Sequence, residues 1–93
     1  MTSHSNETSI NLKLRDLTEY DIHTDIKIEL TNMTAEEGEI YGIKSVDRAR
    51  LLTVEISRKN RQAKGLRIIF DNAEEDVIID EARKLRNDLL KEI

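Results

Sequence analysis

Residues 72–93 read NAEEDVIIDEARKLRNDLLKEI, and this stretch decides the fold because its apolar side chains fall on one face of a helix. Asn72 is a good N-cap residue, and the acidic side chains of Glu74, Glu75 and Asp76 complement the positive end of the helix dipole. The apolar residues recur at spacings of three and four, which predicts one long C-terminal helix with a single buried stripe: Ile78, Ala82, Leu85, Leu89 and Ile93.

Upstream of this helix, several segments alternate apolar and polar residues, which is the period of a half-buried strand. They are residues 10–15, 21–30, 52–57 and 66–70. A hairpin joining the first two segments would place Ile10 opposite Ile26 on the buried face. The same register would place Arg15 beside Asp21 on the solvent face, which is a favourable cross-strand pair. The two alternating patterns therefore support each other.

The connecting regions carry weaker signals. The run Thr34-Ala35-Glu36-Glu37 has the form of a capping box, which predicts a single helical turn. Residues 39–46 predict a strand that is interrupted at Gly42, where the alternation breaks as it does at a β-bulge. Residues 58–65 predict a long basic hairpin loop, in which Gly65 supplies a positive φ where the chain re-enters the sheet.

Together these elements predict an α+β fold: a small antiparallel sheet or partial barrel of four to five strands, covered by one long C-terminal helix. The chain has 93 residues, enough for one domain, which we place at residues 10–93 after a flexible polar tail at residues 1–9. The tail has no apolar core typical of a secretory signal, and no apolar run approaches the length of a membrane span. We therefore expect a cytoplasmic protein.

Side chains that could support catalysis are scarce. The chain contains no cysteine, which excludes disulfide frameworks, thiolate metal sites and cysteine nucleophiles. Asp21, His23 and Asp25 share one face of a predicted strand and could in principle hold a metal ion. They also form the polar half of a regular alternation, so we favour a solvated strand face. The sequence predicts a non-enzyme with no cofactor and no metal site.

The charge distribution is the most informative functional feature. The chain carries 15 basic and 19 acidic residues, for a net charge of −4. Residues 44–67 hold eight of the basic residues and only two of the acidic ones, whereas the flanking segments are acidic. This concentration of positive charge predicts an anion-binding surface. Its candidate residues are Arg48, Arg50, Arg58, Lys59, Arg61, Lys64 and Arg67.

Two classes of partner fit this surface. We favour an acidic protein partner, so that the chain would act as a small regulator, inhibitor or adaptor that binds through its basic hairpin. The alternative is duplex nucleic acid held through its phosphates, which the overall acidity disfavours. Single-stranded nucleic acid fits poorly, because three aromatic residues cannot furnish a stacking surface. A homodimer stays open, through an exposed sheet edge or the helix stripe.

Overall fold

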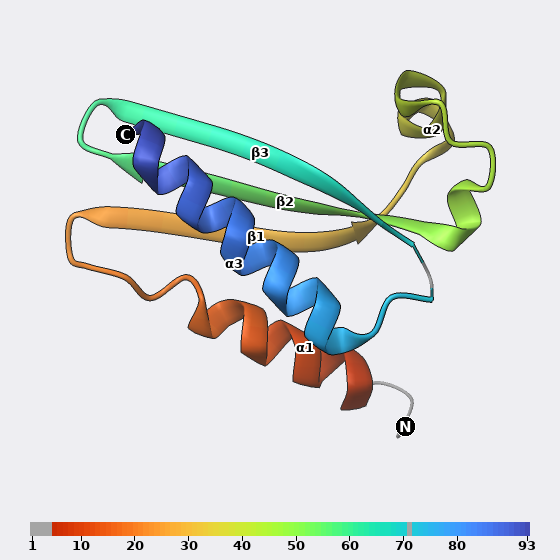
Figure 1. Ribbon diagram of the computed structural model, residues 1–93, viewed down its shortest axis with the longest axis horizontal. Coiled ribbons are helices and arrows are strands. Elements are labelled where there is room, and N and C mark those ends of the chain that lie inside the picture. Colours follow the sequence, from red (N-terminus) through yellow and green to blue (C-terminus); the bar gives the residue numbers. More distant parts are fainter. Residues whose placement is uncertain (1–4, 71) are drawn as a thin grey trace.

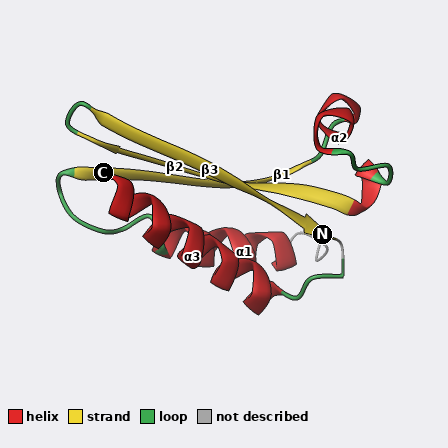
Figure 2. Ribbon diagram, turned by 45° about the horizontal axis from the view of Figure 1, so that its top comes forward, coloured by secondary structure: helices red, strands yellow, loops and turns green. Residues whose placement is uncertain are grey.

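Figure 1 shows the computed structural model of the chain, which describes residues 5–70 and 72–93. The elements are α1 (Ser5–Asp16), β1 (Thr24–Asn32), α2 (Ala35–Tyr41), the 3-10 turn η2 (Val46–Arg48), β2 (Ala49–Arg58), β3 (Arg61–Phe70) and α3 (Glu75–Glu92). The three antiparallel strands form one sheet in the order β1-β2-β3. Helices α1 and α3 lie side by side on one face of this sheet (Figure 2). The α+β class and the C-terminal helix are confirmed, but the described chain forms three strands rather than four to five.

The prediction of a strand at residues 10–15 is wrong, because this segment belongs to α1. Ile10, Leu14 and Leu17 are buried, and their spacings of four and three place them on one face of a helix. Leu12, which strand alternation would bury, is 50% exposed. The helix begins at Ser5, inside the segment predicted as a tail. Residues 1–4 lie outside the described residues.

Because α1 replaces the first predicted strand, the predicted hairpin between residues 10–15 and 21–30 does not form. β1 pairs instead with β2, so that Ile28 lies opposite Val54. The strand nature of residues 24–30 is confirmed. Ile26, Ile28 and Leu30 face the helices, while the alternate polar residues face away from them.

The second predicted hairpin is confirmed, but its connection is a tight turn and not a long loop. Arg58 pairs with Arg61, which leaves only Lys59 and Asn60 in the turn, with Lys59 at a φ of 54°. The predicted positive φ at Gly65 is wrong, since Gly65 lies within β3. A Cβ atom there would lie 2.8 Å from Cδ1 of Leu85, so glycine permits α3 to approach the sheet closely.

The segment between β1 and β2 is helical, so the predicted strand at residues 39–46 is wrong. The capping box is confirmed: the N–H of Glu37 donates to Oγ1 of Thr34 at 3.2 Å, and the N–H of Thr34 donates to Oε1 of Glu37 at 2.8 Å. α2 continues beyond one turn and ends at Gly42, whose φ of 72° is a left-handed C-cap rather than a bulge. The segment covers one end of the sheet's other face, where a small cluster forms around Met33, Ala49 and Leu51.

The main core lies between the sheet and the two long helices. Leu52, Val54 and Ile56 of the central strand β2 are fully buried, because strands flank them on both sides and helices cover them. Each such side chain stabilises the fold by about 1.5–3 kcal/mol. The predicted stripe of α3 is confirmed at its four buried positions, which are Ile78, Ala82, Leu85 and Leu89. The N-cap of α3 is Glu74 and not the predicted Asn72.

Candidate binding surfaces

The structure separates the seven cations that were predicted to bind an anion. Arg48 and Arg50 lie where β2 begins, whereas Arg58, Lys59 and Arg61 lie at its opposite end. β2 has ten residues, so its ends are about 30 Å apart at about 3.3 Å per residue. The two remaining cations, Lys64 and Arg67, point to opposite faces of β3 because their numbers differ by three. Only Arg58, Lys59 and Arg61 come together, and we call these three residues the hairpin tip.

Arg58 is the most firmly held residue of the hairpin tip. Its Nε donates to Oγ1 of Thr24 at 2.8 Å, and its Nη2 lies 3.5 Å from Oδ2 of Asp21. The Thr24 hydroxyl, the backbone N–H of His23 and the charge of Arg58 hold the pKa of the Asp21 carboxyl below its usual range. This network anchors Arg58 to the start of β1.

The other two residues of the hairpin tip are free to meet a partner. Lys59 and Arg61 are exposed, and neither forms an ion pair with any residue that the structure describes. Arg61 donates a hydrogen bond to the backbone carbonyl of Ile93 at the end of α3, with an Nη1–O distance of 3.4 Å. The hairpin tip therefore offers unpaired positive charge beside one anchored guanidinium.

The remaining predicted cations occupy other settings. Arg67 lies 3.7 Å from a carboxylate oxygen of Glu81, so it joins β3 to α3. Lys64 lies opposite Glu55 on the face of the sheet that α1 and α3 leave uncovered. Arg48 is exposed in η2. Arg50 is half-buried on the helix side, and its buried Nε has no hydrogen-bond partner within the described part of the chain.

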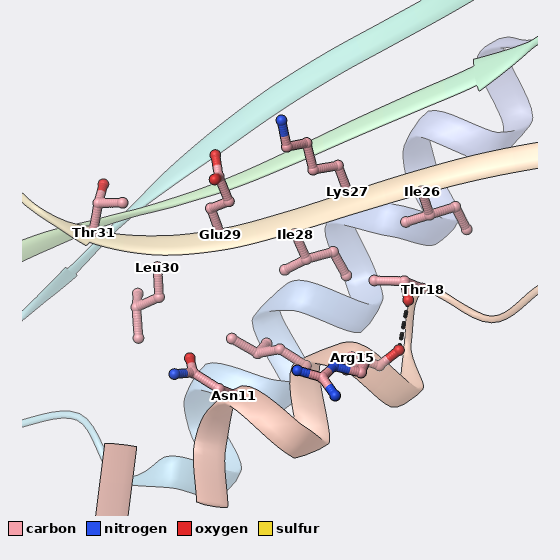
Figure 3. A pocket seen from close by; sticks show the side chains of 10 residues that line it. Asn11, Arg15, Thr18, Ile26, Lys27, Ile28, Glu29, Leu30 and Thr31 are labelled. Carbon is pink, nitrogen blue, oxygen red and sulfur yellow. Dashed lines mark hydrogen bonds between the residues drawn. The ribbon is translucent and has the colours of Figure 1, made fainter. Parts of the chain in front are cut away.

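A second surface lies along the outer edge of the sheet. The sequence left an exposed sheet edge open as a route to a homodimer, but it did not predict a groove there. A groove of about 430 Å³ separates β1 from α1, and we call it the α1–β1 groove (Figure 3). Its lining residues are Asn11, Leu14, Arg15, Thr18 and residues 26–31. An adjoining hollow of about 320 Å³ shares Asn11, Leu30 and Thr31 with the groove and reaches Arg50.

The alternation in residues 21–30 does predict that Ile26, Ile28 and Leu30 are buried, yet these three side chains are only half-buried. The difference arises because, within residues 5–70 and 72–93, β1 has a neighbouring strand on one side alone. No signal in the sequence distinguishes an edge strand with such a pattern from an interior strand. The groove could be found only once the order of the strands was known.

The sequence predicted that Asp21, His23 and Asp25 form a solvated strand face and not a metal site. Among the residues that the structure describes, no group of three potential ligands lies close enough to hold a metal ion. Oδ1 of Asp21 accepts a hydrogen bond of 2.9 Å from the backbone N–H of His23, so this carboxylate shapes the turn before β1. Within the same residues, no helix has the length and apolarity needed to cross a membrane.

Comparisons of the chain with protein-family models, with curated proteins and with solved structures found no match. Its function must therefore be inferred from its own residues.

Proposed function

We propose that this chain is a non-catalytic binding module that recognises an acidic surface of a partner protein through the hairpin tip. The observation that carries the proposal is the convergence of Arg58, Lys59 and Arg61 at the end of a two-residue turn. Three cations there lie within four residues, and two of them lack an ion pair among the described residues.

The hairpin tip suits a carboxylate partner because of its rigidity. Arg58 is held by Thr24 and Asp21 before any partner arrives, so little side-chain entropy is lost when it binds. Arg61 lies at the end of the β-ladder, and Lys59 lies in the two-residue turn that closes it, so neither depends on a long loop for its position. Charges of this kind mainly accelerate association and select among partners.

An extended polyanion fits the same place less well. Asp21 lies beside Arg58, and Glu92 lies in the last turn of α3 next to the carbonyl that Arg61 contacts. A nucleic-acid duplex wide enough to cover the hairpin tip would also approach these carboxylates, which repel phosphates. A compact acidic patch on a protein can avoid them. Duplex binding remains the alternative that the test must address.

The test uses two probes, a polyglutamate peptide and a DNA duplex, each titrated at low and at moderate salt. We expect the polyglutamate peptide to bind and the duplex to show no affinity near about 1 µM at low salt. Lys59→Ala and Arg61→Ala should each slow association with the peptide. Lys44→Ala is the matched control, because Lys44 is an exposed cation in the loop after α2.

Two results would contradict the proposal. The hairpin tip is only a solvated turn if both substitutions leave peptide binding unchanged. Duplex recognition is the better function if the DNA binds tightly and loses affinity steeply with salt, by about one log-log unit for each phosphate contacted.

A further inference from the structure

The outer edge of β1 presents backbone groups that are ready to pair with another strand. The N–H of Met33 donates to the carbonyl of Ala49 at 3.3 Å, and these residues continue the register in which Asn32 lies opposite Arg50. Hydrogen-bonded and non-bonded pairs alternate along an antiparallel ladder. The odd-numbered residues of β1 therefore bond to β2. The N–H and C=O groups of Ile26, Ile28 and Leu30 must point outward.

Thr24 supports this assignment of the free edge. Its even number places its N–H on the outward side, and this N–H donates to the carbonyl of Asp21 at 3.3 Å, within the turn that precedes the strand. Beyond this residue the outward groups meet no strand of the described chain, because β1 is the first strand of the sheet order. An edge of this kind is a template for strand addition.

The helix layer is wider than the sheet that it covers. Two helices side by side span about 20 Å, at about 10 Å each. Three strands span only about 14 Å, at about 4.8 Å each. Figure 1 shows α1 on the outer side of β1, away from the other strands, and Figure 2 shows it on the same face as α3. α1 therefore lies beneath the position that a fourth strand would take, and the α1–β1 groove is the space between them.

The chemistry of the α1–β1 groove selects the kind of strand that fits. Figure 3 shows Ile26, Ile28 and Leu30 pointing toward α1, whereas Lys27 and Glu29 point to the opposite side of β1. On the helix side, the charged residues that line the groove and its adjoining hollow are Arg15 and Arg50. Both are cations, and the helix side of the groove has no described carboxylate in its lining.

A second copy of this chain is a poor occupant. Pairing β1 with β1 of another copy would bring a second α1 to the same side of the sheet, into the space beside β1 that the first α1 already occupies (Figure 1). A single extended segment brings no such helix. It would bury the half-exposed isoleucines and leucine and pair the outward backbone groups.

We propose that the α1–β1 groove binds an extended segment of a partner protein, which adds to β1 as a fourth strand. Its inward side chains are apolar opposite Ile26, Ile28 and Leu30 and acidic where they meet Arg15 and Arg50. This mode of binding is β-augmentation, in which the backbone provides affinity and alternate side chains provide specificity. The surface is separate from the hairpin tip, so either proposal can fail without the other.

The experiment selects a phage-displayed library of random peptides, about nine residues long to match β1, on the full chain. We expect the enriched peptides to alternate apolar and acidic residues. Arg15→Glu should weaken their binding about 10-fold or more, because it reverses an exposed charge in the groove. Lys64→Glu is the matched control, since it reverses a charge on β3, at the other edge of the sheet.

Amide hydrogen exchange of the complex then locates the peptide. The amides of Ile26, Ile28 and Leu30 should become protected when the peptide binds. Those of Lys27 and Glu29 should already be protected in the free protein. Lys59→Ala and Arg61→Ala should leave this binding unchanged, which separates it from recognition by the hairpin tip.

Several results would overturn the proposal. They are a selection that enriches nothing or enriches basic peptides, protection that appears along β3, and binding that Lys64→Glu weakens as much as Arg15→Glu. A protein that is dimeric without peptide, and whose dimer protects the same three amides, would assign the edge to a second copy instead.

Discussion

Replacing Gly65 by alanine tests whether the close contact between β3 and α3 determines the residue at this position. An added Cβ atom would lie 2.8 Å from Cδ1 of Leu85, whereas carbon atoms prefer about 3.5–4.0 Å. Leu85 is 4% exposed and packs in a cluster with Val54, Ile56 and Leu89, so it has little room to retreat. Overpacking of this kind costs about 1–3 kcal/mol.

An opposing effect reduces this cost. Alanine is more favourable than glycine within a strand by about 0.5–1 kcal/mol, because it loses less backbone entropy on folding. We therefore expect Gly65→Ala to lower the free energy of unfolding by about 1 kcal/mol net. In a domain of this size, that change lowers the melting temperature by about 4–8 °C. Thermal and urea unfolding, followed by circular dichroism, measure both quantities.

A double-mutant cycle identifies the cause of the expected loss. Leu85→Ala alone should cost about 2–5 kcal/mol, because it opens a cavity in the core. It also removes both Cδ1 and Cγ of Leu85, so the nearest remaining atom is Cδ2 of Leu89 at an ordinary 3.6 Å. Gly65→Ala should then be neutral or stabilising in the Leu85→Ala background. The reasoning fails if Gly65→Ala stabilises the parent protein, or if it costs the same in both backgrounds.

Three further predictions concern a cap, a turn and an ion pair. Thr34→Ala should lower the free energy of unfolding by about 0.5–2 kcal/mol, because it removes the capping box of α2. The amide of Glu37 should then exchange its hydrogen faster, and unchanged exchange would contradict the role of the cap. Lys59→Gly should stabilise the protein by up to about 1 kcal/mol, because Lys59 has a φ of 54°, which glycine adopts without strain. A lower free energy of unfolding in urea would show that this φ carries no strain. The hydrogen bond and charge of Glu75 raise the pKa of Lys13, so their stabilising effect is present at lower pH and is lost as the pH rises through that raised pKa. Above a pH of about 10.4, the free energy of unfolding should therefore fall more steeply with pH for the parent than for Lys13→Met. Equal slopes for the two proteins would contradict this linkage.

The elements that sequence reasoning predicted correctly are those whose large apolar residues follow one period without ambiguity. The stripe of α3 at Ile78, Ala82, Leu85 and Leu89 fits a helix and cannot alternate as a strand does. In the central strand, Leu52, Val54 and Ile56 alternate with polar residues and fit no helix face. These positions are buried by the fold itself, so local pattern and tertiary structure agree.

The start of β3 was missed for the opposite reason. Residues 61–65 face α3 through Ala63 and Gly65, which are small because the helix approaches closely. Small side chains produce little hydrophobic signal, so a strand segment whose other three residues are polar resembles a loop. The same error placed Lys64 in one long loop with Arg58, Lys59 and Arg61. The two-residue turn gathers the last three residues and leaves Lys64 on β3, where Arg67 was already predicted to lie on a strand.

The wrong prediction at residues 10–15 and the open edge of β1 have one physical origin. Ile10 and Leu14 fit both a strand period and a helix period, whereas Leu17 fits only the helical face. The helix forms because α3 and the sheet offer a surface on which the face with Ile10, Leu14 and Leu17 can pack. The predicted strand would have paired with residues 21–30. The same residues form α1 instead, alongside the edge that the strand would have covered (Figure 1). The helix layer is thus wide enough to cover four strands, whereas the described sheet has three. Among the described residues, the outward backbone groups of β1 therefore have no partner strand along the α1–β1 groove, and the partner strand that we propose would complete the sheet.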